Sequence, residues 1–311
     1  MANEVEFFTS LLTAALRLAT PLLLASLGEI ISQKSGVLNM GLEGIMATSA
    51  FIAFTVTFFT GNVWLGILSA LGTGALFGLL HAFVSIRIKV NQVVMGLSIA
   101  IFGVGLGGFL YRAIFGVQTV PPQVPDYIHL RVIYPGIQNV PVIGSILLDQ
   151  SYFFFIAVIL VPIIALVFSK TSIGLRIRSV GENPKAADTV GINVNRTRYI
   201  CVIVGSMLAA LGGAALTLDV GTFREYMIAG RGWISIALVA FARWNPYFAL
   251  GGAFLFGGAD ALQLRLQTFN LGVPSYIFWM LPYALTLIVL ILFYKGAGAP
   301  ASLGQPYQRG E

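Results

Sequence analysis

Seven ionisable side chains lie within long apolar segments of this sequence, where a charge is costly to bury and is by default a candidate for function. They are Arg17, Glu29, Glu43, His81, Arg112, Arg231 and Asp260. The chemistry that such groups offer is the binding of a polar solute, because carboxylates accept hydrogen bonds and guanidinium groups donate them. Glu43 and Arg231 are the strongest candidates, since glycines interrupt the segments in which they lie. Proton coupling would need a connected chain of acids, and we find none in this set.

The other ionisable residues have simpler explanations. Arg17 and Arg112 are long enough to extend to a membrane surface, and Glu29 is expected close to one. Asp260 is expected to pair with Arg265, although a spacing of five residues on a helix is not ideal. His81 is expected to be packed or hydrogen-bonded within its segment.

Sequence patterns for catalysis are absent. The chain contains neither the phosphate-binding pattern G-x-x-x-x-G-K-[ST] nor the nucleophile pattern G-x-S-x-G. His81 and His129 have no Glu or Cys at metal-ligand spacing, and the single Cys201 allows neither an internal disulfide nor a thiol cluster. We therefore expect no metal, no cofactor and no enzymatic activity in this chain. If ATP drives its function, ATP and Mg²⁺ bind to another chain.

The composition is that of an integral membrane protein. Hydrophobic residues make up 57% and charged residues 10%, with a mean hydropathy of +0.88. Soluble domains carry roughly a quarter charged residues. The net charge of +6 does not indicate nucleic-acid binding, because the basic residues stand in short tracts beside apolar segments, as orientation signals do. The expected surroundings are the lipid bilayer, with the chain crossing a cell membrane several times.

Nine segments are long and apolar enough to be candidates for crossing the ~30 Å hydrocarbon core, which takes about twenty residues. They cover residues 8–31, 41–60, 63–86, 92–115, 151–169, 199–218, 227–243, 246–264 and 276–294. The expected fold class is all-α: one transmembrane domain over residues 1–311, built as a bundle of about nine spans. The second and seventh segments depart most from a regular span, so eight or ten spans remain open.

The distribution of basic residues predicts the orientation. Nine spans place the two termini on opposite sides, and with the N-terminus outside, 12 of the 18 Lys and Arg residues fall in inner loops and the tail. Those twelve are Lys34, Arg87, Lys89, Lys170, Arg176, Arg178, Lys185, Arg196, Arg198, Arg243, Lys295 and Arg309. Because positive charge is retained in the cytosol, we expect an external loop at 116–150 and a cytosolic loop at 170–198.

Two of the spans are expected to be broken helices. The second begins Gly-Val-Leu-Asn-Met-Gly-Leu-Glu-Gly at 36–44, and the seventh begins Gly-Arg-Gly-Trp at 230–233. Such a pair in the two halves of a transporter indicates a central site, because unwound backbone at membrane depth is tolerated only where it lines a cavity or is buried in protein. The alternative is that these glycines only permit close helix packing, as expected for Gly74-x-x-x-Gly78.

The polar stretch 172–199 contains a short helix that is expected outside the membrane. Asn183-Pro184 predicts a helix cap followed by proline at the first position, and Gly191 supplies the end. Ala186 and Ala187 would give this helix a small face that fits the groove of a soluble partner. The alternative is an ordinary solvated loop that its charges keep in the cytosol.

Four stretches together resemble the ABC importer permeases for branched-chain amino acids, simple sugars and nucleosides. They are residues 36–44, 91–97, 174–191, and 230–237 followed by Trp244-Asn245-Pro246. Ala186-Ala187-x-x-x-Gly191 is similar to the coupling motif E-A-A-x-x-x-G of ABC importers, with Lys185 in place of the usual Glu. Residues 39–44 with 91–94 most resemble the shorter of the two permeases in bacterial nucleoside importers.

This resemblance implies a bacterial inner-membrane subunit with several partners: a homologous permease, two copies of an ATPase that binds ATP and Mg²⁺, and an extracytoplasmic substrate-binding lipoprotein. It also implies two groups of site residues. The residues implied for the substrate path are Asn39, Glu43, Asn91, Gln92, Arg231, Trp233 and Ser235. The residues implied for coupling to the ATPase are Glu182, Asn183, Pro184, Ala186, Ala187, Asp188 and Gly191.

The expected solute is a nucleoside, whose flat apolar base and polar ribose suit aromatic and amide side chains. Simple sugars and branched-chain amino acids remain alternatives within the same family. An ion-coupled secondary transporter would explain the spans and their charges, but gives no reason for a docking helix at 184–191. A structural membrane scaffold would explain only the glycine packing.

Overall fold

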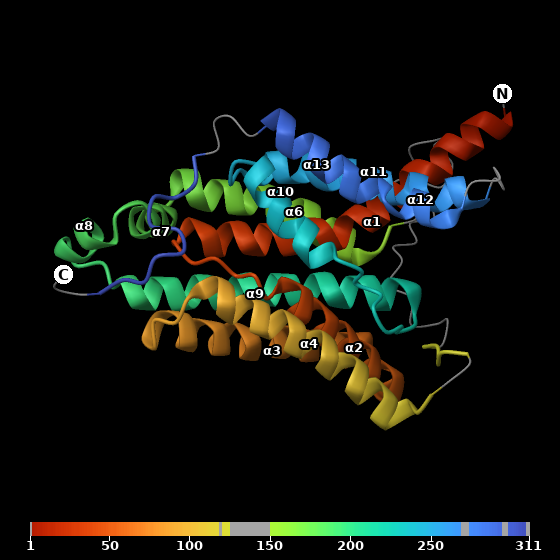
Figure 1. The fold of residues 1–311 in the computed structure, drawn as a ribbon, viewed down its shortest axis with the longest axis horizontal. Coiled ribbons are helices and arrows are strands. Elements are labelled where there is room, and N and C mark those ends of the chain that lie inside the picture. The colour runs from red at the N-terminus through yellow and green to blue at the C-terminus, as the bar shows by residue number, and fades with distance from the viewer. Residues whose placement is uncertain (1, 118–119, 125–149, 269–273, 294–297, 309–311) are drawn as a thin grey trace.

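The computed structural model describes residues 2–117, 120–124, 150–268, 274–293 and 298–308. In this part of the chain all the regular elements are helical, which confirms the all-α prediction (Figure 1). The long helices are α1 (Ala2–Lys34), α2 (Leu42–Thr60), α3 (Val63–Ala82), α4 (Gln92–Phe115), α6 (Tyr152–Lys170), α9 (Val194–Val220) and α11 (Pro246–Thr268). The shorter elements are the π-helical turn η1 (Phe83–Arg87), α7 (Ser172–Glu182), α8 (Pro184–Thr189), α10 (Arg231–Phe241), α12 (Ser275–Trp279) and α13 (Leu281–Phe293).

Six helices of the described residues are long and apolar enough to cross a membrane. They cover Phe7–Lys34, Leu42–Thr60, Val63–Arg87, Gln92–Phe115, Tyr152–Lys170 and Val194–Val220. The other three predicted segments are helical as well, but α10 has only 11 residues, and the last segment is divided into α12 and α13. The predicted number of nine spans is therefore approximate.

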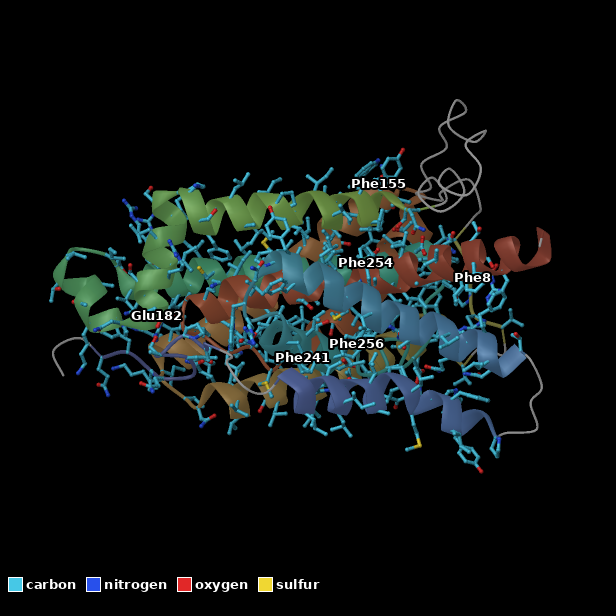
Figure 2. All side chains as sticks on the ribbon, turned by 90° about the horizontal axis from the view of Figure 1, so that it is seen from above. Phe8, Phe155, Glu182, Phe241, Phe254 and Phe256 are labelled. Carbon is cyan, nitrogen blue, oxygen red and sulfur yellow. The ribbon has the colours of Figure 1, made fainter. Side chains whose placement is uncertain are left out.

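The centre of the bundle is formed by α1 and α9, which pack against each other. α2 and α3 also pack on α9, whereas α10 and α11 pack on α1. Residues 21–30 of α1 are all buried, as expected of a helix with neighbours on every side. Figure 2 shows α6 along one edge of the bundle and α13 along the opposite edge.

Glycines set how closely these helices approach. A β-carbon on Gly78 of α3 would lie 2.8 Å from the β-carbon of Ser206 on α9. A β-carbon on Gly103 of α4 would lie 2.6 Å from the α-carbon of Gly44 on α2. Since real β-carbons do not come this near, these contacts need glycine, which confirms the predicted close packing at Gly74-x-x-x-Gly78.

The two predicted helix breaks are present. α1 ends at Lys34 and α2 begins only at Leu42, so residues 35–41 form an irregular segment that is largely buried. The backbone N–H of Asn39 donates to the Glu29 carboxylate at 3.0 Å, and its side chain donates to the Ser206 hydroxyl at 3.2 Å. The second break lies at residues 221–230, between α9 and α10, and ends where the predicted stretch 230–233 begins, because residues 231–233 already belong to α10. In the first break, protein groups thus satisfy unwound backbone inside the bundle, as is required within a membrane.

The chain enters and leaves at opposite ends of the bundle. Figure 1 shows the N-terminal end of α1 at one end, and α7, α8 and the C-terminal residues at the other. This arrangement agrees with an odd number of passes. Most of the predicted external loop at 116–150 lies outside the described residues, so its structure remains a prediction.

Candidate functional site

Glu43 joins the two broken helices. It lies in the first turn of α2, and its carboxylate oxygens accept the backbone N–H groups of Gly230 and Gly232, each at 2.8 Å. These N–H groups belong to the start of α10, where a helix has unsatisfied donors and a positive end that favours a carboxylate. Glu43 therefore caps α10 from another helix.

Gly232 makes this contact possible. A β-carbon at Gly232 would collide with the backbone nitrogen of Glu43. Gly230 has φ +81°, in the left-handed region that side chains rarely adopt. The two glycines that indicated a broken segment are therefore needed for different reasons: Gly232 for the close approach to Glu43, and Gly230 for its left-handed backbone.

Arg231 points to a third helix. One of its terminal nitrogens donates to the Asp260 carboxylate on α11 at 2.9 Å, and the other donates to the carbonyls of Met227 and Ile228. The expected pairing of Asp260 with Arg265 is wrong. Arg265 lies instead over the ring of Phe7 on α1, 5.4 Å from its centroid.

Two other ionisable residues of the apolar segments have partners within the protein. Glu29 is 1% exposed and accepts hydrogen bonds from Gln33 and the Asn39 backbone. Arg17 forms an ion pair with Asp219 at 3.1 Å, joining α1 to α9. The expected packing of His81 is confirmed, because this buried ring hydrogen-bonds to the Leu38 carbonyl oxygen at 3.2 Å.

A cavity of about 500 Å³ opens beside the Glu43 cap. This volume falls within the usual range for sites that hold a small molecule. Its walls come from the start of α2, the C-terminal half of α4, and residues 223–230. They carry three aromatic rings, of Phe109, Phe223 and Tyr226, and four charged groups, of Glu43, Arg112, Arg224 and Glu225. A flat apolar surface beside hydrogen-bonding groups suits a solute with both kinds of surface.

Arg112 and Glu225 form an ion pair in the cavity wall. Nε and Nη2 of Arg112 donate to the two carboxylate oxygens of Glu225 at 2.7 and 2.6 Å, the bidentate geometry that arginine favours. The hydrogen bonds from Arg112 lower the pKa of the Glu225 carboxyl. Arg112 remains 62% exposed in this pair, so its outer face is available to a solute.

Most of the predicted path residues support the fold. Among the described residues that line the cavity, Glu43 is the one that belongs to the seven predicted path residues. Asn39, Gln92 and Ser235 are buried: Gln92 accepts the Leu38 N–H at 2.8 Å, and Ser235 donates to the Arg231 carbonyl at 2.8 Å. Two others are exposed. They are Asn91, whose side chain caps the start of α4, and Trp233 on α10.

Sequence reasoning missed Glu225 and the aromatic residues of the cavity. Glu225 lies in the short Arg-Glu-Tyr stretch at 224–226, between two apolar segments, which marks it only as a polar connection. Its partner Arg112 is 113 residues away. No local spacing rule could have found this pair.

The residues predicted for coupling form a separate group at the end of the bundle that carries α7 and α8. The Asn183 side chain accepts the Ala186 N–H at 3.0 Å, Pro184 opens α8, and Gly191 has φ +84°. The predicted short helix and its cap are therefore confirmed. Glu182 and Ala186 are exposed and Asp188 is half-buried, and Figure 2 places Glu182 at this end.

Ala187 does not share an exposed face with Ala186. It is only 2% exposed and packs with Val180 and Val194, with Tyr307 lying against this group. The prediction that both alanines face outward is wrong for Ala187. A small residue is needed there because α8 rests on its own protein at this position.

The sequence of this chain is similar to those of known transport permeases. The family described as branched-chain amino acid transport system / permease component matches residues 11–290. The guanosine ABC transporter permease protein NupQ of Bacillus subtilis is 36% identical, with 99% of each chain covered. The nucleoside ABC transporter permease protein NupC of Lactococcus lactis is also 36% identical, with 98% of each chain covered. TsgC13 of Haloferax volcanii, a permease protein named for a glucose ABC transporter, is 39% identical over 86% of this chain and 81% of its own.

A second guanosine ABC transporter permease protein of Bacillus subtilis, NupP, is 22% identical over 91% of this chain and 80% of its own. Among solved structures, an inward-facing ABC transporter of metal-chelate type has a TM-score of 0.52. It is 17% identical and covers 91% of this chain and 85% of that one. This likeness concerns the fold alone.

Proposed function

Because the chain belongs to the family described as branched-chain amino acid transport system / permease component, it is a membrane permease of an ABC importer, and we propose that its solute is a nucleoside. The family match covers residues 11–290, which is nearly all of the membrane domain. As a permease component, the chain forms a multi-pass part of the cell membrane. The reaction that releases energy belongs to a different subunit.

The observation that carries the nucleoside proposal is the make-up of the cavity. Phe109 and Tyr226 are exposed and offer ring faces on which a nucleobase can stack, and such stacking tolerates different bases. Arg112 and Glu225 offer donors and acceptors that suit ribose hydroxyls and base edges. Relatives named for guanosine and nucleoside transport support this proposal over almost the full length.

A simple sugar is the second candidate. The relative named for glucose transport has 39% identity, although it covers less of each chain. A sugar would use the same hydroxyl-binding groups and a ring face. It would leave at least one of the two exposed rings, Phe109 and Tyr226, without a contact, because a single pyranose has no flat base.

The proposed partners follow from the architecture of such importers. Bacillus subtilis has two permeases named for the same solute, NupQ and NupP, so we propose that this chain pairs with a second, homologous permease. Two ATPase subunits, which bind ATP and Mg²⁺, would contact the end that carries α8, and a substrate-binding lipoprotein would meet the opposite end. The cavity beside Glu43 would then be part of the path between them.

The deciding experiment uses the assembled importer in proteoliposomes. ATP hydrolysis and uptake are measured with the binding protein loaded with guanosine, glucose or leucine. We expect guanosine to stimulate both, and glucose and leucine to leave both at the unstimulated level. Stimulation by glucose alone would replace the nucleoside proposal with the sugar one. ATP hydrolysis by this chain alone, free of any ATPase, would contradict the assignment of hydrolysis to a partner.

A further inference from the structure

Arg198 is a buried cation near the start of α9, only 1% exposed. Its three nitrogens donate to three different oxygens. Nε donates to the Ser35 carbonyl at 3.1 Å, Nη1 to the Gln305 carbonyl at 3.0 Å, and Nη2 to the Ser302 hydroxyl at 3.1 Å. A buried charge must be compensated by hydrogen bonds, so this side chain fixes the end of α1 to the C-terminal tail.

The tail, here residues 301–307, makes further contacts with both neighbours. Ser302 donates its hydroxyl and its backbone N–H to the Gly181 carbonyl, at 2.7 and 2.9 Å. The N–H of Gly304 donates to the Gly36 carbonyl at 3.1 Å. The tail therefore bridges the last turn of α7 and the first residues of the broken segment 35–41.

The same tail also holds α8. Tyr307 packs against the buried group formed by Val180, Ala187 and Val194. A cavity of about 350 Å³ lies between the start of α8 and the tail, lined by Asn183, Pro184 and Tyr307 among others. A movement of α8 relative to the bundle would have to displace Tyr307 or carry the tail with it.

Close approaches leave little freedom in this assembly. A β-carbon on Gly36 would lie 2.7 Å from both Nη2 of Arg198 and the hydroxyl of Ser302. A β-carbon on Gly181 would collide with the Lys34 carbonyl. Groups packed at this density transmit displacement instead of absorbing it.

We propose that Arg198 and the tail form a joint that transmits movement of α8 to the broken segment 35–41, and that Arg198 is its positioning residue. This proposal rests on the docking role proposed for α8. The broken segment continues directly into Glu43, whose carboxylate caps α10 at the cavity. Movement at the ATPase end would thus reach the cavity wall through hydrogen bonds to the main chain of Ser35 and Gly36, and from there along the chain to Glu43.

The test replaces Arg198 with lysine in the assembled importer. Lysine keeps the charge but offers one point of contact in place of a planar fork, so it cannot bridge three acceptors spread around a guanidinium. The matched control is Arg196→Lys, at an exposed position on the same helix. Solute taken up per ATP hydrolysed is measured in proteoliposomes, together with recovery of the ATPase on purification and the melting temperature of the complex.

For Arg198→Lys we expect the ATPase to co-purify and to hydrolyse ATP, while uptake per ATP falls roughly tenfold, a size within the range of coupling mutations. Ser302→Ala, which removes one acceptor for Arg198 and one donor to Gly181, should lower the same ratio by a smaller factor. Arg196→Lys should leave the ratio unchanged.

Two results would overturn the joint. One is an unchanged ratio in Arg198→Lys. The other is equal loss of uptake and hydrolysis together with a lower melting temperature, which would show that Arg198 only stabilises the fold. A wild-type chain that purifies without any ATPase would overturn both this proposal and the docking role of α8, so the two failures are distinguishable.

Discussion

The carboxylate of Glu43 on α2 accepts the backbone N–H of Gly232 on α10 at 2.8 Å, across 189 residues of sequence. One broken helix is therefore capped by the side chain of the other. Each half of the chain contributes one of them, so the contact ties the two halves together beside the cavity.

Glu43→Gln should damage both stability and transport. The amide retains one oxygen, but its NH₂ group would face a backbone donor, leaving a partly buried N–H without an acceptor. Such a loss costs about 1–3 kcal/mol. We expect a lower melting temperature and reduced uptake by the assembled importer. Wild-type values for both would show that this cap is dispensable.

Gly232→Ala tests the same contact from the other helix. The added β-carbon would collide with the Glu43 backbone and push α10 away from α2. Uptake should fall strongly, because the displaced helix start borders the cavity. Gly258→Ala on α11 is the matched control, since a β-carbon there meets nothing within 4 Å and should be tolerated. Equal behaviour of the two variants would contradict the close approach described here.

Glu225→Gln and Arg112→Gln should alter solute affinity more than folding, because Arg112 is largely exposed in the cavity wall. We expect each variant to raise the KM for uptake roughly fivefold to tenfold, which corresponds to the loss of one hydrogen bond worth about 1–1.4 kcal/mol. The double variant should be no worse than the single variants if the two residues act as a pair. The uptake kinetics of all three variants provide the measurement, and additive effects would show separate roles.

The Arg112–Glu225 pair also predicts a pH dependence. The hydrogen bonds from Arg112 lower the pKa of Glu225, so the paired carboxylate persists through the ordinary titration range of a glutamate. The contribution of the pair is present above that range and is lost only as the pH falls through the lowered pKa. In the Glu225→Gln variant, the measured solute affinity should not show this loss as the pH falls. A loss near neutral pH in the wild-type protein would come from another group.

Ala186→Trp tests docking at α8. Ala186 is exposed, so a bulky side chain there should leave the fold intact while separating a closely packed partner. A steric clash in a packed interface costs roughly 1–3 kcal/mol. We expect normal amounts of membrane protein but loss of the co-purified ATPase and of uptake. Ile200→Trp, at an exposed site on α9, is the control. Ala187→Trp is unsuitable for this purpose, because it would disrupt the buried group beneath α8. Wild-type uptake by Ala186→Trp would contradict docking at this face of α8.

Much of the helical framework was predictable because its signals are local. The segment predicted at 92–115 coincides with α4, and the Asn-Pro pair at 183–184 gave the correct start of α8. Apolar length, helix caps and glycines depend only on neighbouring residues. The two broken helices followed from glycine content in the same way.

The pairing of charges was not predictable, because it depends on which helices become neighbours. Asp260 is five residues from Arg265 but bonds to Arg231, 29 residues away. The prediction of which side of α8 is exposed was wrong for a related reason. In a helix of six residues, the buried side is decided by what lies beneath it, here Val180 and Val194.

The ion pairs Arg17–Asp219 and Arg231–Asp260 have a consequence for electrical work. Each joins two helices, α1 with α9 and α10 with α11, and each sums to zero formal charge. Moving one elementary charge through a membrane potential costs about 2.3 kcal/mol per 100 mV. A rearrangement that carries each pair as a unit moves no net charge through that field. These four residues therefore add no electrical work of their own to a movement of the helices that keeps the pairs intact.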